Sequence, residues 1–294
     1  MAGNTNQVGF GIFTMCAGVF CLATGDAVAK WLGNHYPTSQ LIFFRELFSL
    51  PSVLILALST GGLYKLKPNR LWVLTLTGTF QLLAIGSFLF ALRFMPLASA
   101  WAIAFSGPLM VTVLTPIMLR ERVGPLRWTA TLAGFVGVLI VLRPGSGAFQ
   151  WAAVLPLVTA LTSSLSLLMA RRYAQQEDFA AMVAFMIGIP LLLTSFIMPF
   201  DFVEPQPVHW PAFFTLGALS GASITFTTLA YRVTQAANVA PFDYTALIWA
   251  TLWGWVIWQD VPGYHTGIGA VLIVGSGLFV LYRETVRRRV RRAT

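Results

Sequence analysis

Ten apolar segments recur along the whole chain, and this pattern limits the folds that the chain can adopt. A helix of about 20 apolar residues spans the hydrocarbon core of a bilayer. The links between the segments are about three to eleven residues long, which is too short for a soluble domain. The sequence therefore predicts an all-α integral membrane protein with ten transmembrane helices. We expect them at 8–32, 40–59, 71–93, 97–119, 126–143, 150–173, 180–198, 210–233, 238–258 and 265–283.

The charge distribution favours the same fold class and predicts an orientation. Charged residues make up 10% of the chain, whereas about a quarter of the residues in a soluble domain are charged. The net charge of +9 could indicate a nucleic-acid partner, but the Lys and Arg residues gather at alternate links, as they do in cytoplasmic loops. We therefore expect a lipid bilayer and no nucleic acid as partner. Both termini should be cytoplasmic in a bacterial inner membrane, with a basic tail over 285–294 at the lipid headgroups.

A shift of 139 residues places the second half of the chain on the first. Hydrophobic blocks, helix breakers and one acidic link residue keep this offset for about a hundred residues, so that Glu121 meets Asp260. We infer an internal duplication, with one repeat at 1–145 and the other at 146–284. Five helices per repeat is an odd number, so the second repeat is inverted in the membrane. Such repeats are typical of secondary transporters, in which they supply the inward-open and outward-open states.

Four charged residues fall inside the predicted membrane helices. Asp26 and Lys30 are four residues apart on one face of the first helix, where an acid and a base can neutralise each other. Arg45 and Glu46 lie inside the second. Charges at this depth are costly and are candidates for function. A structural network of all four residues is one interpretation, and a role for Asp26 and Lys30 at the outer mouth is the other.

Prolines interrupt corresponding helices of the two repeats. Pro108 lies in the fourth helix and Pro241 near the start of the ninth, although the two do not align in register. Bent or broken helices at matching places in two repeats often mark a transporter's binding site. Polar and aromatic residues near these bends, with one residue each from the third and eighth helices, form the predicted substrate cavity: Gln81, Trp101, Ser106, Pro108, Ser223, Asp243, Tyr244 and Trp249.

The links after the fourth and ninth helices carry a family resemblance. Leu119-Arg120-Glu121-Arg122 precedes a glycine-rich helix, and Trp258-Gln259-Asp260 precedes another. The pattern resembles the drug/metabolite transporter superfamily, specifically its ten-helix EamA-type members, and is most similar to the YddG-type exporters of aromatic and other neutral amino acids. Asp260 departs from the family's usual Glu. The resemblance implies a basket-shaped bundle with a cavity formed by helices 1, 3, 4, 6, 8 and 9, and with helices 5 and 10 at the periphery.

The favoured function is alternating-access export of neutral or aromatic amino acids, with efflux of drugs or organic cations, or uptake of another metabolite, as alternatives. Either Glu46 or Asp243 could carry a coupled proton. An enzyme is disfavoured, because the three histidines lack the spacing of metal ligands and no nucleophile or phosphate-binding motif occurs. We expect no cofactor, no metal and no catalytic residue. The protein could be a monomer or a homodimer.

Overall fold

The computed structural model describes residues 2–60, 62–121, 123–143, 151–173 and 176–293. The predicted boundary between the repeats, at 145/146, lies outside these residues. All elements of the described part are helical. The longer helices of the first half are α1 (Ala2–Leu32), α2 (Thr38–Thr60), α3 (Leu71–Ala91), α4 (Leu97–Ala104), α5 (Gly107–Met118) and α6 (Pro125–Leu142). Those of the second half are α7 (Val154–Tyr173), α8 (Phe179–Asp201), α9 (Trp210–Val233), α11 (Thr245–Trp258) and α12 (Tyr264–Ala293).

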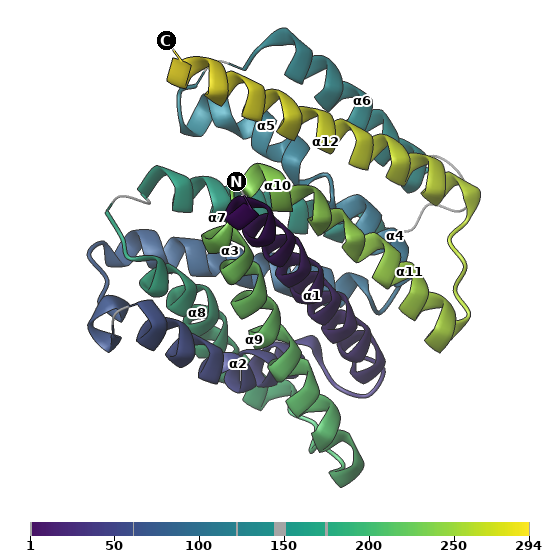
Figure 1. Cartoon of the computed structure of the whole chain (residues 1–294). Coiled ribbons are helices and arrows are strands. Elements are labelled where there is room, and N and C mark those ends of the chain that lie inside the picture. The colour runs from purple at the N-terminus through teal and green to yellow at the C-terminus, as the bar shows by residue number, and fades with distance from the viewer. Residues whose placement is uncertain (1, 61, 122, 144–150, 174–175, 294) are drawn as a thin grey trace.

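Short helices complete this arrangement (Figure 1). They are α10 (Ala236–Val239) and the 3₁₀ helices η1 (Leu63–Leu66), η2 (Trp151–Ala153), η3 (Pro207–His209) and η4 (Ala240–Tyr244). In the described part, nine segments are long and apolar enough to cross a membrane when α4 and α5 are counted together. The predicted helix at 238–258 is the tenth segment, and it is divided among α10, η4 and α11. The all-α membrane fold is therefore confirmed. Helix α12 continues through most of the predicted basic tail, to Ala293.

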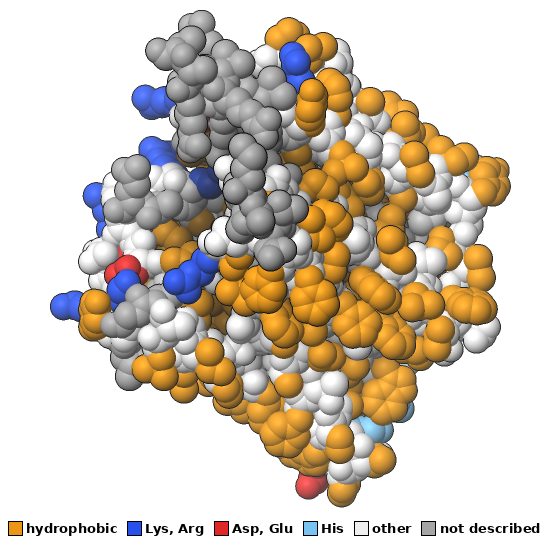
Figure 2. Space-filling view, in the orientation of Figure 1, with side chains coloured by type: hydrophobic (Ala, Val, Ile, Leu, Met, Phe, Trp, Pro, Cys, Tyr) orange, Lys and Arg blue, Asp and Glu red, His pale blue; other side chains and the backbone are white. Residues whose placement is uncertain are grey.

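The outer surface of the bundle is apolar, as a lipid-facing surface must be. Large hydrophobic side chains are exposed on it, among them Phe13 (68%), Phe196 (67%) and Phe200 (91%). Figure 2 shows hydrophobic side chains over most of the visible face, with Lys and Arg gathered toward one end. Such a surface would aggregate in water, so the structure describes a multi-pass membrane protein.

The two halves pack around an approximate two-fold relation. α1 packs against α9 as α7 packs against α3, and α2 packs against α9 as α8 packs against α3. Equivalent helices also pair with each other, α2 with α8 and α6 with α12. Figure 1 shows α6 and α12 side by side at the edge of the bundle. Their close approach requires glycine, because a Cβ on Gly137 would lie 2.9 Å from the carbonyl oxygen of Gly269.

The links lie at two ends of the bundle, which we name by their residues. The histidine end comprises 33–37, 92–96, 202–209 and 259–263, and the arginine end comprises 62–70, 119–121, 123–124, 176–178 and 234–235. At the histidine end, the Tyr36 hydroxyl lies 2.7 Å from His209 Nδ1 and accepts the Gln206 N–H at 3.0 Å. At the arginine end, the Glu177 carboxylate accepts the backbone N–H groups of Asn69 and Arg70. Each end therefore has a polar contact that fixes links from both halves.

Candidate functional site

The fourth and ninth segments break at equivalent positions. α4 ends at Ala104 and α5 begins at Gly107, whereas η4 ends at Tyr244 and α11 begins at Thr245. The 139-residue shift places Phe105 on Tyr244, so the breaks align although the prolines do not. Pro108 has no N–H to donate to the Ala104 carbonyl four residues earlier, which explains the first break. The Ser106 N–H donates to the Ile103 carbonyl, three residues earlier, at 2.9 Å. This is a 3₁₀-type hydrogen bond and not the bond to the fourth preceding residue that an α-helix makes.

Aromatic rings from both halves gather at these breaks. The rings of Phe105 and Tyr244, equivalent residues of the two halves, have centroids 4.8 Å apart. Trp101 extends the group on one side, with its ring 5.3 Å from Phe105 and 5.2 Å from Phe88. Trp101, Phe105 and Trp249 also pack around one buried apolar cluster that includes Val239 and Ala246. The structure therefore brings together Trp101, Tyr244 and Trp249, three of the predicted cavity residues.

Phe105 was missed by the sequence analysis, and so was Phe20. The Phe20 ring meets Trp249 edge to face with centroids 4.8 Å apart. The shift of 139 residues could have identified Phe105, because it stands opposite the predicted residue Tyr244. No comparable sequence signal marks Phe20, which lies on α1 among other apolar residues.

Three hydrogen-bonding groups beside these rings are buried without a regular partner in the described part of the chain. They are the Trp101 indole Nε1, the Ser106 hydroxyl and the Tyr244 hydroxyl. The Trp101 indole is directed toward Asp26 without reaching regular hydrogen-bond geometry. The Tyr244 hydroxyl lies against Gly277 of α12, where any side chain would overlap it. An unpaired buried polar group costs about 1–3 kcal/mol, so these three groups are candidate contacts for a ligand.

A buried charge cluster adjoins Trp101. Arg45 Nη1 lies 3.4 Å from Asp26 Oδ1, and Arg45 Nε lies 3.7 Å from Glu46 Oε1. Arg45 Nε also donates to the Ser220 hydroxyl at 3.1 Å. Asp26 and Glu46 are each only 2% exposed, and Arg45 is 8% exposed. Two carboxyl groups thus face one guanidinium, an arrangement that leaves one negative charge in excess when both are ionised.

Lys30 is not part of this cluster, which corrects the expectation that it neutralises Asp26. Its Nζ lies 3.5 Å from Asp260 Oδ2 and donates to the Met95 carbonyl at 3.0 Å. The same ammonium lies 4.8 Å from the centroid of the Trp258 ring. Asp26 prefers Arg45 because the guanidinium reaches it from α2. Lys30 therefore connects α1 to the links that follow α3 and α11, at the histidine end.

The remaining predicted residues contribute no aromatic ring to this group. Asp243 accepts a hydrogen bond from the Tyr231 hydroxyl at 3.2 Å. Ser223 is buried on α9, at 4% exposure, and Gln81 is half-buried on α3. Neither Gln81 nor Ser223 makes a side-chain hydrogen bond to the ring group in the described part of the chain. Pro108 acts on the site through the break that it causes.

These features define a class of protein: a membrane transporter with two related halves and a candidate site where a helix of each half is broken. The EamA-like transporter family model matches the chain twice, over residues 9–143 and 150–282. The chain therefore belongs to the EamA-like transporter family.

Several relatives have named substrates. The chain is 30% identical over 274 residues to a riboflavin transporter of Rhizobium johnstonii, covering 90% of this chain and 88% of the relative. It is 25% identical over 265 residues to an S-adenosylmethionine uptake transporter of Rickettsia prowazekii, covering 88% of each. It is 26% identical over 266 residues to a pseudopaline exporter of Pseudomonas aeruginosa, covering 90% of this chain and 93% of the relative. None of these three is named for amino-acid transport.

One solved crystal structure has the same fold. It superposes with a TM-score of 0.64 and 20% sequence identity, over 97% of this chain and 99% of the other. This likeness supports the arrangement of the helices.

Proposed function

We propose that the protein transports a flat aromatic metabolite bound between the two broken helices. The observation that supports this proposal is the group of three buried polar groups that lack a regular hydrogen-bond partner among the described residues and lie beside rings from both halves. Rings stack on a planar heterocycle, and hydroxyl and indole donors fit its carbonyl or ring-nitrogen acceptors. Riboflavin, which has such a heterocycle, is the first substrate to test, because 30% identity to a named riboflavin transporter supports this class.

Export of neutral or aromatic amino acids is the second candidate. It is favoured by the charge cluster beside Trp101, where a carboxylate excess suits an ammonium group and Arg45 suits a carboxylate. The similarity to YddG-type exporters suggested this substrate class. Coupling to protons through Glu46 or Asp243 is compatible with either substrate, because a buried carboxyl group can carry a proton between the two sides.

Flux measurements in proteoliposomes separate the candidates. Labelled riboflavin is compared with a panel of Trp, Phe, Met, Thr, Glu and Lys, loaded inside or added outside, with and without a pH gradient. Saturable riboflavin flux without amino-acid flux supports the first candidate, and the reverse supports the second. An effect of the gradient that disappears in Glu46→Gln or Asp243→Asn identifies the proton carrier. Absence of flux for every compound, with folded protein, contradicts both candidates.

The hydroxyl groups of Ser106 and Tyr244 allow a more specific prediction. Ser106→Ala and Tyr244→Phe each remove a buried hydroxyl without a partner, so we expect unchanged or higher thermal stability without substrate, by up to about 1 kcal/mol. Each should also weaken substrate binding by about 5- to 10-fold, because one ligand hydrogen bond is lost. Thermal unfolding and transport KM are measured on the same preparations.

A matched control removes a hydroxyl that does have a partner. Thr194 is 2% exposed on α8, and its hydroxyl donates to the Pro190 carbonyl at 2.6 Å. Thr194→Val should leave KM unchanged. If Ser106→Ala and Tyr244→Phe lower stability and leave KM unchanged, the hydroxyl groups serve the fold, and the site is wrongly placed.

A further inference from the structure

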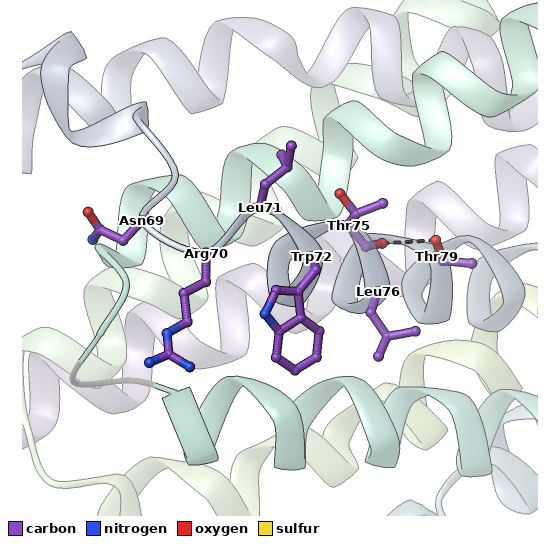
Figure 3. A pocket seen from close by; sticks show the side chains of 7 residues that line it. All are labelled: Asn69, Arg70, Leu71, Trp72, Thr75, Leu76 and Thr79. Atoms are coloured by element: carbon purple, nitrogen blue, oxygen red, sulfur yellow. Dashed lines mark hydrogen bonds between the residues drawn. The ribbon is translucent and has the colours of Figure 1, made fainter.

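A pocket outside the candidate site lies at the start of α3, at the arginine end. Its volume is about 880 Å³, and it is lined by residues between Asn69 and Thr79. Figure 3 shows Arg70, Trp72 and Leu76 projecting from the same side of α3. Because α3 begins at Leu71, the pocket lies where a membrane-spanning helix enters the bilayer. We call it the α3 pocket.

Arg70, which lines the α3 pocket, shares an aromatic neighbour with a second arginine, Arg172. The guanidinium carbons of Arg70 and Arg172 each lie 5.8 Å from the centroid of the Tyr173 ring. Both arginines are exposed. Within the described residues, neither guanidinium lies within ion-pair distance of a carboxylate. Both guanidinium groups therefore lie near the Tyr173 ring, and neither is paired with an acidic side chain in the described part of the chain.

Glu177, an acidic residue near these arginines, is bound to backbone groups. Both carboxylate oxygens of Glu177 accept backbone N–H groups, from Asn69 and Arg70, in the turn that precedes α3. Arg172 donates one hydrogen bond to the Met118 carbonyl at 3.0 Å, which uses one of its five N–H groups. The guanidinium groups thus retain donors for a further anionic ligand.

Besides Arg70, Asn69 and two threonines, the α3 pocket is lined by the apolar side chains of Leu71, Trp72 and Leu76. The Trp72 side chain is 55% exposed and meets the Tyr173 ring edge to face with centroids 5.6 Å apart. Leu76 is 36% exposed one turn deeper along α3. Tryptophan prefers the headgroup level of a bilayer, and leucine prefers the acyl region. Along α3, Arg70, Trp72 and Leu76 therefore follow one another in the same order as the phosphate, the glycerol region and the acyl chains of a phospholipid.

We propose that the α3 pocket binds an anionic phospholipid. The lipid phosphate lies against the guanidinium groups of Arg70 and Arg172, the glycerol region beside Trp72, and an acyl chain along Leu76. Arginine matches the geometry of a phosphate with paired N–H donors. Basic pockets between membrane helices bind anionic headgroups in this way. The proposal depends on membrane insertion alone and is independent of the transported substrate.

Native mass spectrometry of the purified full-length protein tests the proposal. Phosphatidylglycerol and phosphatidylcholine with the same acyl chains are titrated into wild type, Arg70→Gln/Arg172→Gln and a control, Lys67→Gln/Arg232→Gln. The control removes the same charge from two other exposed residues, Lys67 at the arginine end and Arg232 in the last turn of α9 beside it. We expect wild type and control to retain phosphatidylglycerol over phosphatidylcholine, and the arginine variant to bind phosphatidylglycerol about tenfold more weakly.

Two further arms identify the ligand. Inorganic phosphate at millimolar concentration should not displace the lipid, because the acyl chain contributes to binding, and Trp72→Ala should weaken binding of both lipids. Equal phosphatidylglycerol binding by the arginine variant and the control overturns the proposal. So does equal binding of the two lipids by wild type, or full displacement by phosphate. Arg70→Lys/Arg172→Lys keeps the charge and should bind phosphatidylglycerol with intermediate affinity. This variant replaces the Gln variant in the comparison if the Gln variant is unstable.

Discussion

The two ends of the bundle are joined by different kinds of contact. At the histidine end, Lys30 contacts a carboxylate, a carbonyl and an indole ring, and its side chain is only 11% exposed. At the arginine end, Arg172 of the second half donates one hydrogen bond to Met118 of the first, and it is exposed. A partly buried ion pair is stronger than an exposed hydrogen bond. Of these two contacts, the Lys30 contact at the histidine end is therefore expected to be the stronger.

The comparison of the two repeats shows that the Lys30–Asp260 ion pair has no equivalent at the arginine end. The shift of 139 residues places Lys30 on Met169 and Asp260 on Glu121, so the acid of this pair recurs but the base does not. In a transporter with inverted repeats, equal contacts at the two ends would make the two access states equally stable. An asymmetric ion pair favours one of them. Three variants, ordered by the size of the expected effect, test where this asymmetry resides.

The largest effect is expected from Arg45→Met, in the charge cluster near the histidine end. The variant leaves the carboxyl groups of Asp26 and Glu46 buried without their cation, and breaking a buried pair costs about 3–5 kcal/mol. Thermal unfolding in detergent should show a large loss of stability. Asp26→Asn/Arg45→Met/Glu46→Gln removes all three charges and should recover most of it. If Arg45→Met is as stable as wild type, the charge cluster does not contribute to the stability of the fold.

An intermediate effect is expected from Lys30→Met, which breaks the contact between the halves. We estimate a loss of about 1–2 kcal/mol, between the values for exposed and buried pairs, which changes the population of the open state about 5- to 30-fold. Maleimide labelling of Ala98→Cys, in a Cys16→Ala/Cys21→Ala background, reports this opening. Lys67→Met, at the other end, is the control. Unchanged labelling in Lys30→Met would mean that the ion pair does not close this end.

The smallest effect is expected from Arg172→Ala at the arginine end. Its hydrogen bond to Met118 is exposed, so its loss should change stability by less than about 1 kcal/mol. The same labelling assay should therefore show less than about a fivefold change. If Arg172→Ala changes labelling more than Lys30→Met does, the Arg172 contact at the arginine end is the stronger of the two.

The first broken helix could be predicted from the sequence, and the second only in part. Pro108 lacks the N–H that an uninterrupted helix requires, so its effect is local and visible in the residue itself. Pro241 predicted a bend, but it did not predict that 236–258 divides into three short helices ending in register with the first break. That division depends on packing against α1 and α4, which are distant in sequence.

The choice of ionic partners shows what local spacing cannot decide. Asp26 and Lys30 are four residues apart, a spacing that permits a pair on one helix face. Arg45 and Asp260 come from elsewhere in the chain, and the folded bundle places each of them next to one member of that expected pair. Local spacing cannot reveal a competing partner 19 or 230 residues away, so it could permit the Asp26–Lys30 pair without showing which partners each residue takes.

The sequence by itself determined the membrane fold, the ten segments and the repeat. Each follows from hydrophobicity along the chain, since a helix that crosses a bilayer satisfies its own backbone hydrogen bonds and needs only enough apolar length. Tertiary structure decided which rings meet at the breaks and which charges pair. These depend on side chains from both halves, brought together by the packing of antiparallel repeats. The pairing of Phe105 with Tyr244 exists only once both halves are folded.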